Sequence, residues 1–240
     1  MIQDNYRAVE ARVAAACRRA GRMREDVTLI AVSKTKPVEM VRELQEIGVV
    51  DFGENHAQEL VTKTEAIPEK LNWHFIGHLQ RNKVKYVVGR ACLIHSVSSL
   101  RLAEEIRKES EKKGLVTPVL IEVNIADEST KSGISAEEAI QLVRQVAELP
   151  GLSIRGLMAI APPVEDPEEN RGYFRQMREL KETIAGLHLP GVSMEELSMG
   201  MTGDFEVAIE EGATMVRVGT AIFGARQMMQ RRKRKTTQSF

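Results

Sequence analysis

Short runs of apolar residues alternate along the chain with segments in which apolar residues recur every three or four positions. Runs of the first kind are typical of buried strands, and the spacing of the second is typical of helices that cover a sheet. Apolar residues between Ile2 and Ala20 recur at helical spacing, Gly21 follows as a stop signal, and a β-branched run begins at Val27. The whole pattern predicts eight strands, at residues 27–32, 49–53, 73–76, 93–96, 118–124, 153–159, 196–198 and 214–218.

Helical segments fit into the intervals between these strands. Ser135 and Glu138 have the spacing of a capping box that opens a helix, and a short helix fits residues 204–211. Regular alternation indicates parallel strands joined by helical crossovers. Eight such units in 240 residues match a single (β/α)₈ barrel better than an open doubly wound sheet. We therefore predict one α/β barrel domain over residues 1–230.

The composition is that of an ordinary globular protein, with 34 basic and 34 acidic residues and 42% apolar residues. No apolar run approaches the ~20 residues of a membrane span, and no secretory signal is visible at the N-terminus. Cys17 and Cys92 are too few for a disulfide scaffold or a thiolate zinc cluster. Residues 231–240 carry five basic residues and no acidic one, which we interpret as a solvated tail. We expect a cytoplasmic protein that binds neither nucleic acid nor a membrane.

Lys34 is the first candidate for chemistry, because active groups of (β/α)₈ barrels gather at the carboxyl ends of the strands. It follows the first strand and shares a strand face with Ile30 and Val32. If that face is the barrel interior, the amine is held near apolar walls and is suited to Schiff-base formation. The alternative is a loop lysine that reaches solvent. Lys36 has the same parity but adjoins Pro37, and we expect it to cap the following helix.

Arg217 interrupts the apolar last strand, and a buried guanidinium requires an acceptor. It either forms an internal salt bridge, with Glu122 as the candidate partner, or donates to a ligand in the barrel. Barrel phosphate sites often use the loops after strands seven and eight. These loops hold small and hydroxylated residues here, at 198–202 and at Gly219 and Thr220. The two loops together predict a phosphate site and favour the ligand role, while no residue cluster predicts a metal site.

A barrel lysine, an arginine in the last strand and a phosphate loop behind it fit pyridoxal 5′-phosphate (PLP). Specific motifs support that cofactor: AVSKTKP at 31–37, FGEN at 52–55, WHFIG at 73–77, GLM at 156–158, LSMGM at 197–201 and MVRVGTAIFG at 215–224. With these motifs, residues 2–226 closely resemble the pyridoxal phosphate homeostasis proteins. One departure is Thr202, where serine is the commoner family residue, although threonine keeps the hydroxyl group.

The resemblance implies a cofactor site of seven residues and no catalytic residues. They are Lys34 as the Schiff-base lysine, Ser198, Gly219 and Thr220 at the phosphate, Arg217 at the pyridine nitrogen, and Asn55 and Met158 beside the ring.

The barrel is also similar to the N-terminal domain of alanine racemases, which add a C-terminal β-domain and use a tyrosine as a second acid/base. This chain is expected to end with its barrel and to carry Tyr6, Tyr86 and Tyr173 on helices. An arginine opposite the pyridine nitrogen also weakens PLP as an electron sink. These differences favour a binding role over efficient catalysis.

The resemblance thus implies a monomeric PLP-binding protein that takes part in intracellular PLP (vitamin B6) and amino-acid homeostasis. Apo PLP-dependent enzymes are the expected recipients of the cofactor. The alternative is a low-activity PLP-dependent amino-acid racemase. A third reading is a phosphate-binding barrel enzyme that uses Lys34 as a Schiff-base lysine without PLP.

Overall fold

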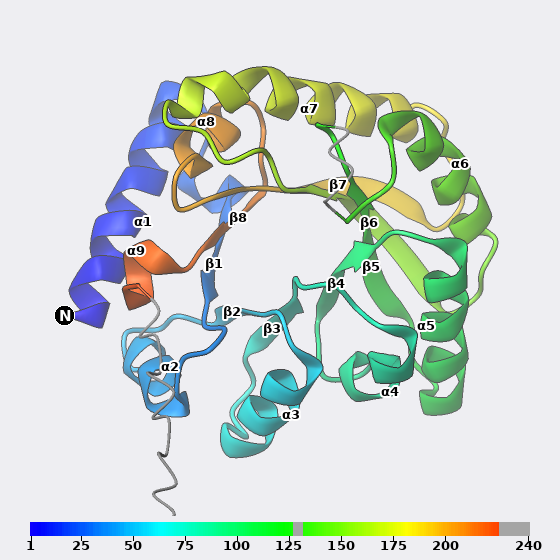
Figure 1. The fold of residues 1–240 in the computed structure, drawn as a ribbon, viewed down its shortest axis with the longest axis horizontal. Helices are drawn as coiled ribbons and strands as arrows, with labels where there is room; N and C mark the ends of the chain where they lie inside the picture. The colour runs from blue at the N-terminus through cyan, green and yellow to red at the C-terminus, as the bar shows by residue number, and fades with distance from the viewer. Residues whose placement is uncertain (127–131, 226–240) are drawn as a thin grey trace, which may run out of the picture.

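The computed structural model describes residues 1–126 and 132–225, and the predicted tail at 231–240 lies outside them. Strands and helices alternate along this part of the chain (Figure 1). The strands are β1 Thr28–Val32, β2 Asp51–Glu54, β3 Asn72–Phe75, β4 Leu93–Val97, β5 Thr117–Val123, β6 Leu152–Ala159, β7 Val192–Met201 and β8 Met215–Val218. The α-helices are α1 Ile2–Arg19, α2 Val38–Gln45, α3 Ala57–Ala66, α4 Val84–Val87, α5 Leu100–Lys113, α6 Ala136–Ala147, α7 Arg171–Ala185, α8 Phe205–Glu210 and α9 Thr220–Phe223. Short 3₁₀ turns lie at Arg24–Asp26, Arg81–Lys83 and Pro167–Asn170.

The strands form a closed parallel barrel in the order of the sequence, so the predicted (β/α)₈ fold is confirmed. Its seam joins the two ends of the chain, because β8 pairs with β1 in a register that sets Met215 opposite Thr28. The N-terminal helix α1 packs across α8 and α9 on the outside of this seam (Figure 1). Within the described residues, no helix is long and apolar enough to cross a membrane.

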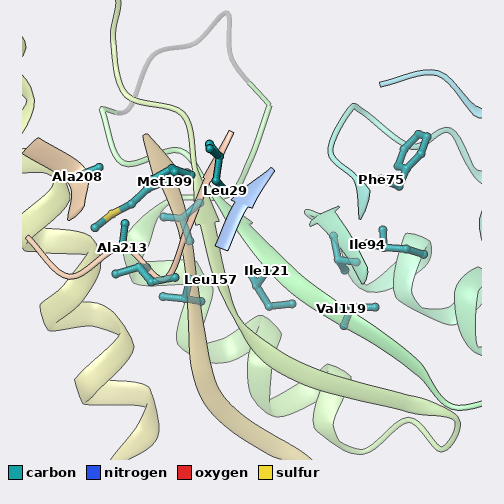
Figure 2. Packing of buried hydrophobic residues seen from close by; sticks show 14 of the residues in the cluster. Leu29, Phe75, Ile94, Val119, Ile121, Leu157, Met199, Ala208 and Ala213 are labelled. Carbon is teal, nitrogen blue, oxygen red and sulfur yellow. The ribbon is translucent and has the colours of Figure 1, made fainter. Parts of the chain in front are cut away.

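Side chains along each strand alternate between the barrel interior and an outer layer covered by helices. In β1, Leu29 and Ala31 belong to the outer layer, part of which is shown in Figure 2. Ile30 belongs instead to a small interior cluster that also contains Leu93, Leu120, Met158 and Met215. Burial of one such large aliphatic side chain contributes about 1.5–3 kcal/mol. Val32 has the same parity as Ile30, so its side chain lies on the interior side of β1.

Element boundaries differ most from the prediction at β7, which spans Val192–Met201 rather than residues 196–198. The first half of this strand alternates exposed Ser193 and Glu195 with buried Met194, so few of its residues are apolar. Glu195 pairs with Arg155 of β6 on the exposed face. Propensity and apolar content thus missed the first half of this strand, which pairing with β6 stabilises.

The predicted capping box is confirmed at the start of α6. Ser135 accepts a hydrogen bond from the Glu138 backbone N–H at 3.2 Å, and the Glu138 carboxylate accepts one from the Ser135 N–H at 3.2 Å. This reciprocal pair satisfies two backbone donors that a helix start leaves without partners.

Candidate functional site

A cavity of about 310 Å³ opens at the carboxyl ends of the strands, and we call it the Lys34 pocket. Its walls come from β1, β7 and β8 and from the segments that follow β1, β2, β3, β6, β7 and β8. Small-molecule sites usually occupy about 300–1,000 Å³, so the pocket suits one small ligand. Five of the seven predicted cofactor residues line it: Lys34, Asn55, Arg217, Gly219 and Thr220.

The other two predicted residues do not line the pocket. Met158 is fully buried in the interior cluster. Ser198 is also fully buried, and its hydroxyl lies 2.9 Å from Nδ1 of His95 and 2.5 Å from Nη1 of Arg217. Thr202 and Gly203, in the same loop region as Ser198, line the pocket instead. Ser198 lies within β7 and its hydroxyl meets His95 and Arg217 in the barrel interior, whereas Thr202 follows the strand and lies at the mouth.

Lys34 lies on a sharp turn between β1 and α2. Val32 and Lys34 line the pocket, and Thr35 takes a left-handed conformation with a φ of 63°. The Lys36 N–H donates to the Ser33 carbonyl at 3.0 Å and closes the turn. On the outer side, the Ser33 hydroxyl donates to Oε1 of Glu54 at 2.6 Å. The turn that carries Lys34 is therefore fixed on both sides.

A buried ion pair supports this turn from behind. Lys63 Nζ lies 2.6 Å from Oε1 of Glu54 and donates to the Ser33 carbonyl at 2.7 Å. Burial raises the pKa of Glu54 to about 7, although Lys63 and the Ser33 hydroxyl act in the opposite direction. Glu59 adds a further tie, because its Oε2 accepts from the Thr35 N–H at 3.0 Å.

Sequence reasoning missed this support, although one signal for it existed. Lys63 follows Ala57 and Leu60 at intervals of three, which places it on the buried face of α3. A lysine on an apolar helix face requires a buried acceptor, and Glu54 ends the neighbouring strand β2.

Arg217 lies in β8, is 4% exposed and reaches the pocket from below. Its Nη2 donates to the Ala159 carbonyl at 2.8 Å, in addition to the Ser198 contact. Among the described ion pairs there is none between Arg217 and Glu122, the alternative left open by the sequence. Burial lowers the pKa of Arg217 to about 10, with Asp204 and Glu122 opposing the change. The side chain thus stays cationic at neutral pH beneath the pocket.

Two loops bring hydroxyl and backbone donors to the pocket. Thr202 and Gly203 follow β7, and Gly219 and Thr220 follow β8. The N–H groups of Ile222 and Phe223 both donate to the Gly219 carbonyl, at 3.0 and 2.8 Å. The backbone N–H groups at the start of α9, before Ile222, have no acceptor within the helix. Donors of this kind suit an anionic oxygen group.

Apolar and amide side chains complete the walls. Ile160 and Met201 line the pocket and are 37% and 38% exposed, so they offer apolar surface that a flat ligand ring would cover. Oδ1 of Asn55 is buried without a hydrogen-bond partner. Gly77 packs against Asn55 so closely that a Cβ there would lie 2.2 Å from the Asn55 carbonyl oxygen. The pocket therefore offers an apolar slot with one unsatisfied polar group.

The prediction that Lys36 caps the helix after it was wrong. Its Nζ donates instead to the carbonyls of Phe223, Gly224 and Ala225, at 3.0, 3.1 and 3.2 Å. These groups lie at the end of α9, where carbonyls lack helical partners and attract cations. These three donated hydrogen bonds occupy all three protons of the Lys36 ammonium group.

The chain is similar over most of its length to known proteins, both in sequence and in structure. Residues 5–227 match the family model described as the alanine racemase N-terminal domain. A pyridoxal phosphate homeostasis protein of Aquifex aeolicus is 48% identical over 90% of this chain and 94% of its own length. A crystal structure of an unknown protein from Bifidobacterium adolescentis superposes with a TM-score of 0.88 at 38% identity, covering 92% of this chain and 94% of that one.

PipY of Synechococcus elongatus, whose structure was solved with PLP bound, superposes with a TM-score of 0.81 at 31% identity. The match covers 93% of this chain and all of PipY. The family-model match at residues 5–227 includes all eight strands and every residue that lines the Lys34 pocket. This chain therefore belongs to the pyridoxal phosphate homeostasis protein family.

Proposed function

We propose that the chain binds PLP in the Lys34 pocket and holds and releases it for the intracellular supply of PLP (vitamin B6) and amino-acid homeostasis. The observation that carries this proposal is the convergence of Lys34, Arg217 and Thr220 on one cavity of about 310 Å³. An amine, a cationic donor and a hydroxyl group correspond to the aldehyde, ring nitrogen and phosphate of PLP. The names of the Aquifex aeolicus relative and of PLP-bound PipY support the same assignment.

Lys34 is the residue we assign to covalent attachment. When bound, PLP supplies an aldehyde that condenses reversibly with a primary amine. Lys34 lines the pocket beside Val32 and Ile76, which shield the new bond from water. The fixed turn from Ser33 to Lys36 orients the amine before a ligand arrives, which lowers the entropy lost on binding.

The phosphate is assigned to the hydroxyl groups of Thr202 and Thr220 and to the backbone around Gly203 and Gly219. These four residues face one pocket from two adjacent loops. The position of Ser198 beneath the pocket leads us to assign its hydroxyl to Arg217 rather than to the phosphate.

Arg217 and Asn55 are assigned to the ring of the ligand. A guanidinium has only donors, so Arg217 would donate to the pyridine nitrogen and leave it without a proton. An unprotonated ring withdraws electron density from a bound amino acid less strongly. This disfavours cleavage of the bonds at the α-carbon of the amino acid. The Asn55 amide, whose Oδ1 has no partner in the protein, would meet the polar substituent of the ring.

The arrangement supports storage and transfer rather than racemisation. A racemase requires proton-transfer groups on both faces of the substrate. Tyr6, Tyr86 and Tyr173 lie on α1, α4 and α7, as predicted, and none of them lines the Lys34 pocket. Lys36 lines the pocket, but its protons are committed to three carbonyls of α9.

Transfer and catalysis are separated by two assays on the PLP-loaded protein. Mixed with an apo PLP-dependent enzyme, the protein is expected to lose its cofactor as the activity of that enzyme appears. In deuterated water with a panel of amino acids, we expect no exchange of α-protons above the level of free PLP. Exchange well above that level, lost in Lys34→Ala, would favour the racemase, and PLP that never leaves would contradict the carrier role.

Replacing Thr220 with valine is expected to weaken PLP binding by about tenfold or more. Valine keeps the shape of threonine but removes a hydroxyl group, and a hydrogen bond to a charged group contributes about 1.5–3 kcal/mol. Equilibrium titration followed by absorbance measures the change. Thr183→Val, which removes an exposed hydroxyl of α7 far from the pocket, serves as the control. Equal affinity of the Thr220 variant and this control would remove Thr220 from the phosphate site.

A further inference from the structure

A continuous file of polar side chains crosses the barrel interior beneath the Lys34 pocket. His74 Nε2 lies 3.1 Å from Asp51 Oδ1, and His74 Nδ1 lies 3.0 Å from His95 Nε2. His95 Nδ1 lies 2.9 Å from the hydroxyl of Ser198, which accepts from Arg217 Nη1 at 2.5 Å. Five residues from β2, β3, β4, β7 and β8 are therefore linked end to end.

The file joins the two mouths of the barrel. Asp51 begins β2, at the mouth opposite the pocket, and its side chain is 24% exposed. His95 and Ser198 are fully buried, and His74 and Arg217 are 3% and 4% exposed. Interior positions of such barrels are usually filled by branched apolar side chains, and a buried polar group without a partner costs free energy. Four buried polar residues that satisfy one another thus form a distinct unit.

The contact between the two imidazoles limits where their protons lie. Two ring nitrogens at 3.0 Å form a hydrogen bond only when one carries a hydrogen and the other does not. With His74 cationic, its Nδ1–H donates to His95 Nε2, and His95 then donates from Nδ1 to the oxygen of Ser198. With His74 neutral and its remaining hydrogen on the Asp51 side, His95 donates from Nε2 and accepts the Ser198 hydroxyl hydrogen at Nδ1. Loss of one proton thus inverts each hydrogen bond between His74 and Ser198.

We propose that His74, His95 and Ser198 form a tautomeric proton relay that positions Arg217 from the opposite mouth of the barrel. They are positioning residues, because none of them lines the Lys34 pocket. In the cationic state the Ser198 oxygen accepts from both His95 and Arg217. In the neutral state it accepts from Arg217 alone while it donates to His95, which strengthens the hold on the guanidinium. The relay rests on the proposed function only for the identity of the ligand that Arg217 meets.

The charges around the two rings assign the first state to neutral pH. Burial lowers the pKa of His74, but its bond to Asp51 and the neighbouring thiol of Cys92 raise it to about 9. Burial, together with the charges of His74 and Arg217, holds the pKa of His95 well below its usual range. His95 therefore stays neutral and changes only its tautomer.

Arg217 carries the charge at the other end of the file, beneath the Lys34 pocket. Asp204 and Glu122 are the acidic groups that face it, and burial lowers its pKa to about 10. The pKa of Arg217 lies above the midpoint expected for His74, so the guanidinium keeps its charge over the lower half of the His74 transition, up to about pH 9. A change at the pocket in that half reports the hydrogen bonding of Ser198.

Nitrogen-15 NMR of histidine-labelled apo protein tests the relay directly. Between pH 6.5 and 10 we expect His74 to lose its imidazolium signature with a midpoint near pH 9. At the same midpoint, neutral His95 should exchange an Nδ1–H for an Nε2–H tautomer. The exposed rings of His56, His78 and His188 serve as internal controls. A His95 tautomer that stays fixed while His74 titrates would overturn the relay.

Asp51→Asn extends the test to the pocket. Loss of the carboxylate is expected to lower the midpoint of both histidine signals by about one pH unit or more. The pH midpoint of the absorbance of bound PLP should shift by the same amount, although Asp51 does not line the pocket. As a control, Glu39→Gln at an exposed position of α2 should leave that midpoint unchanged. An absorbance profile identical to that of the unaltered protein would overturn the link to Arg217. Because the NMR measurement uses apo protein, coupled tautomers in a chain that never binds PLP would support the relay and overturn the proposed function.

Discussion

Replacing Lys34 with alanine is expected to abolish the long-wavelength absorbance that PLP gains when it bonds to the protein. Lys34 lines the pocket, and Lys36, the other lysine there, uses its protons on α9 carbonyls. Without the amine of Lys34, no second amine is positioned for the aldehyde. We expect complete loss of the bonded spectrum, measured by titrating apo protein with PLP.

Lys34→Arg provides the matched variant, because it keeps a positive charge but carries no primary amine. It should also lack the bonded spectrum, while both variants retain the melting temperature of the unaltered protein to within a few degrees. A Lys34 variant that still shows the full bonded spectrum would assign the covalent bond to another residue. Circular dichroism on the same samples shows whether each variant is folded. Loss of the bonded spectrum counts for Lys34 only in a variant that is folded.

Replacing Lys63 with methionine is expected to destabilise the protein by about 3–5 kcal/mol, the usual cost of leaving one partner of a buried ion pair uncompensated. Glu54 is fully buried, and Lys63 is 4% exposed and also bonds to the Ser33 carbonyl behind Lys34. Urea unfolding of the apo protein at pH 8 measures the change. The variant should also take up PLP more weakly, because the turn that carries Lys34 loses its support.

Two comparisons isolate the buried charge as the cause. Adding Glu54→Gln to Lys63→Met should recover most of the lost stability, and Lys108→Met should change stability by less than about 1 kcal/mol, since its pair with Glu105 is exposed. The pKa of Glu54 is already raised to about 7 in the folded protein, above its ordinary value, so protonated Glu54 favours folding at low pH. The defect of Lys63→Met should therefore shrink as the pH falls from 8 toward 5. A defect independent of pH and of Glu54 would contradict this account.

The sequence was most informative where one physical signal dominated. Apolar periodicity located the eight strands because interior and outer faces are both apolar over most of the barrel. The parity of β1 grouped Lys34 with Ile30 and Val32 but left its direction open, and the structure places Val32 and Lys34 in the lining of the pocket. β7 was too short in the prediction because its first half is stabilised by pairing rather than by apolar content.

Contacts between residues that are far apart in the sequence could not be predicted from the local pattern of apolar and polar residues. Arg217 could be recognised as unusual, but its partners Ser198 and Ala159 come from two other strands whose register was unknown. The same holds for Lys36, whose acceptors lie about 187 residues away in the sequence. Registers between strands decide such contacts, and one-residue shifts move a side chain to the other face.

Peptide mapping after borohydride reduction tests the central claim most directly. Reduction fixes bonded PLP on its lysine as a stable secondary amine, and mass spectrometry of the digested protein then locates the added pyridoxyl phosphate group. We expect one modified peptide, containing Lys34, at close to one group per chain. Modification spread over surface lysines, or no modification after incubation with PLP, would contradict PLP binding in the Lys34 pocket. Either result would favour the alternative of a phosphate-binding barrel enzyme without PLP.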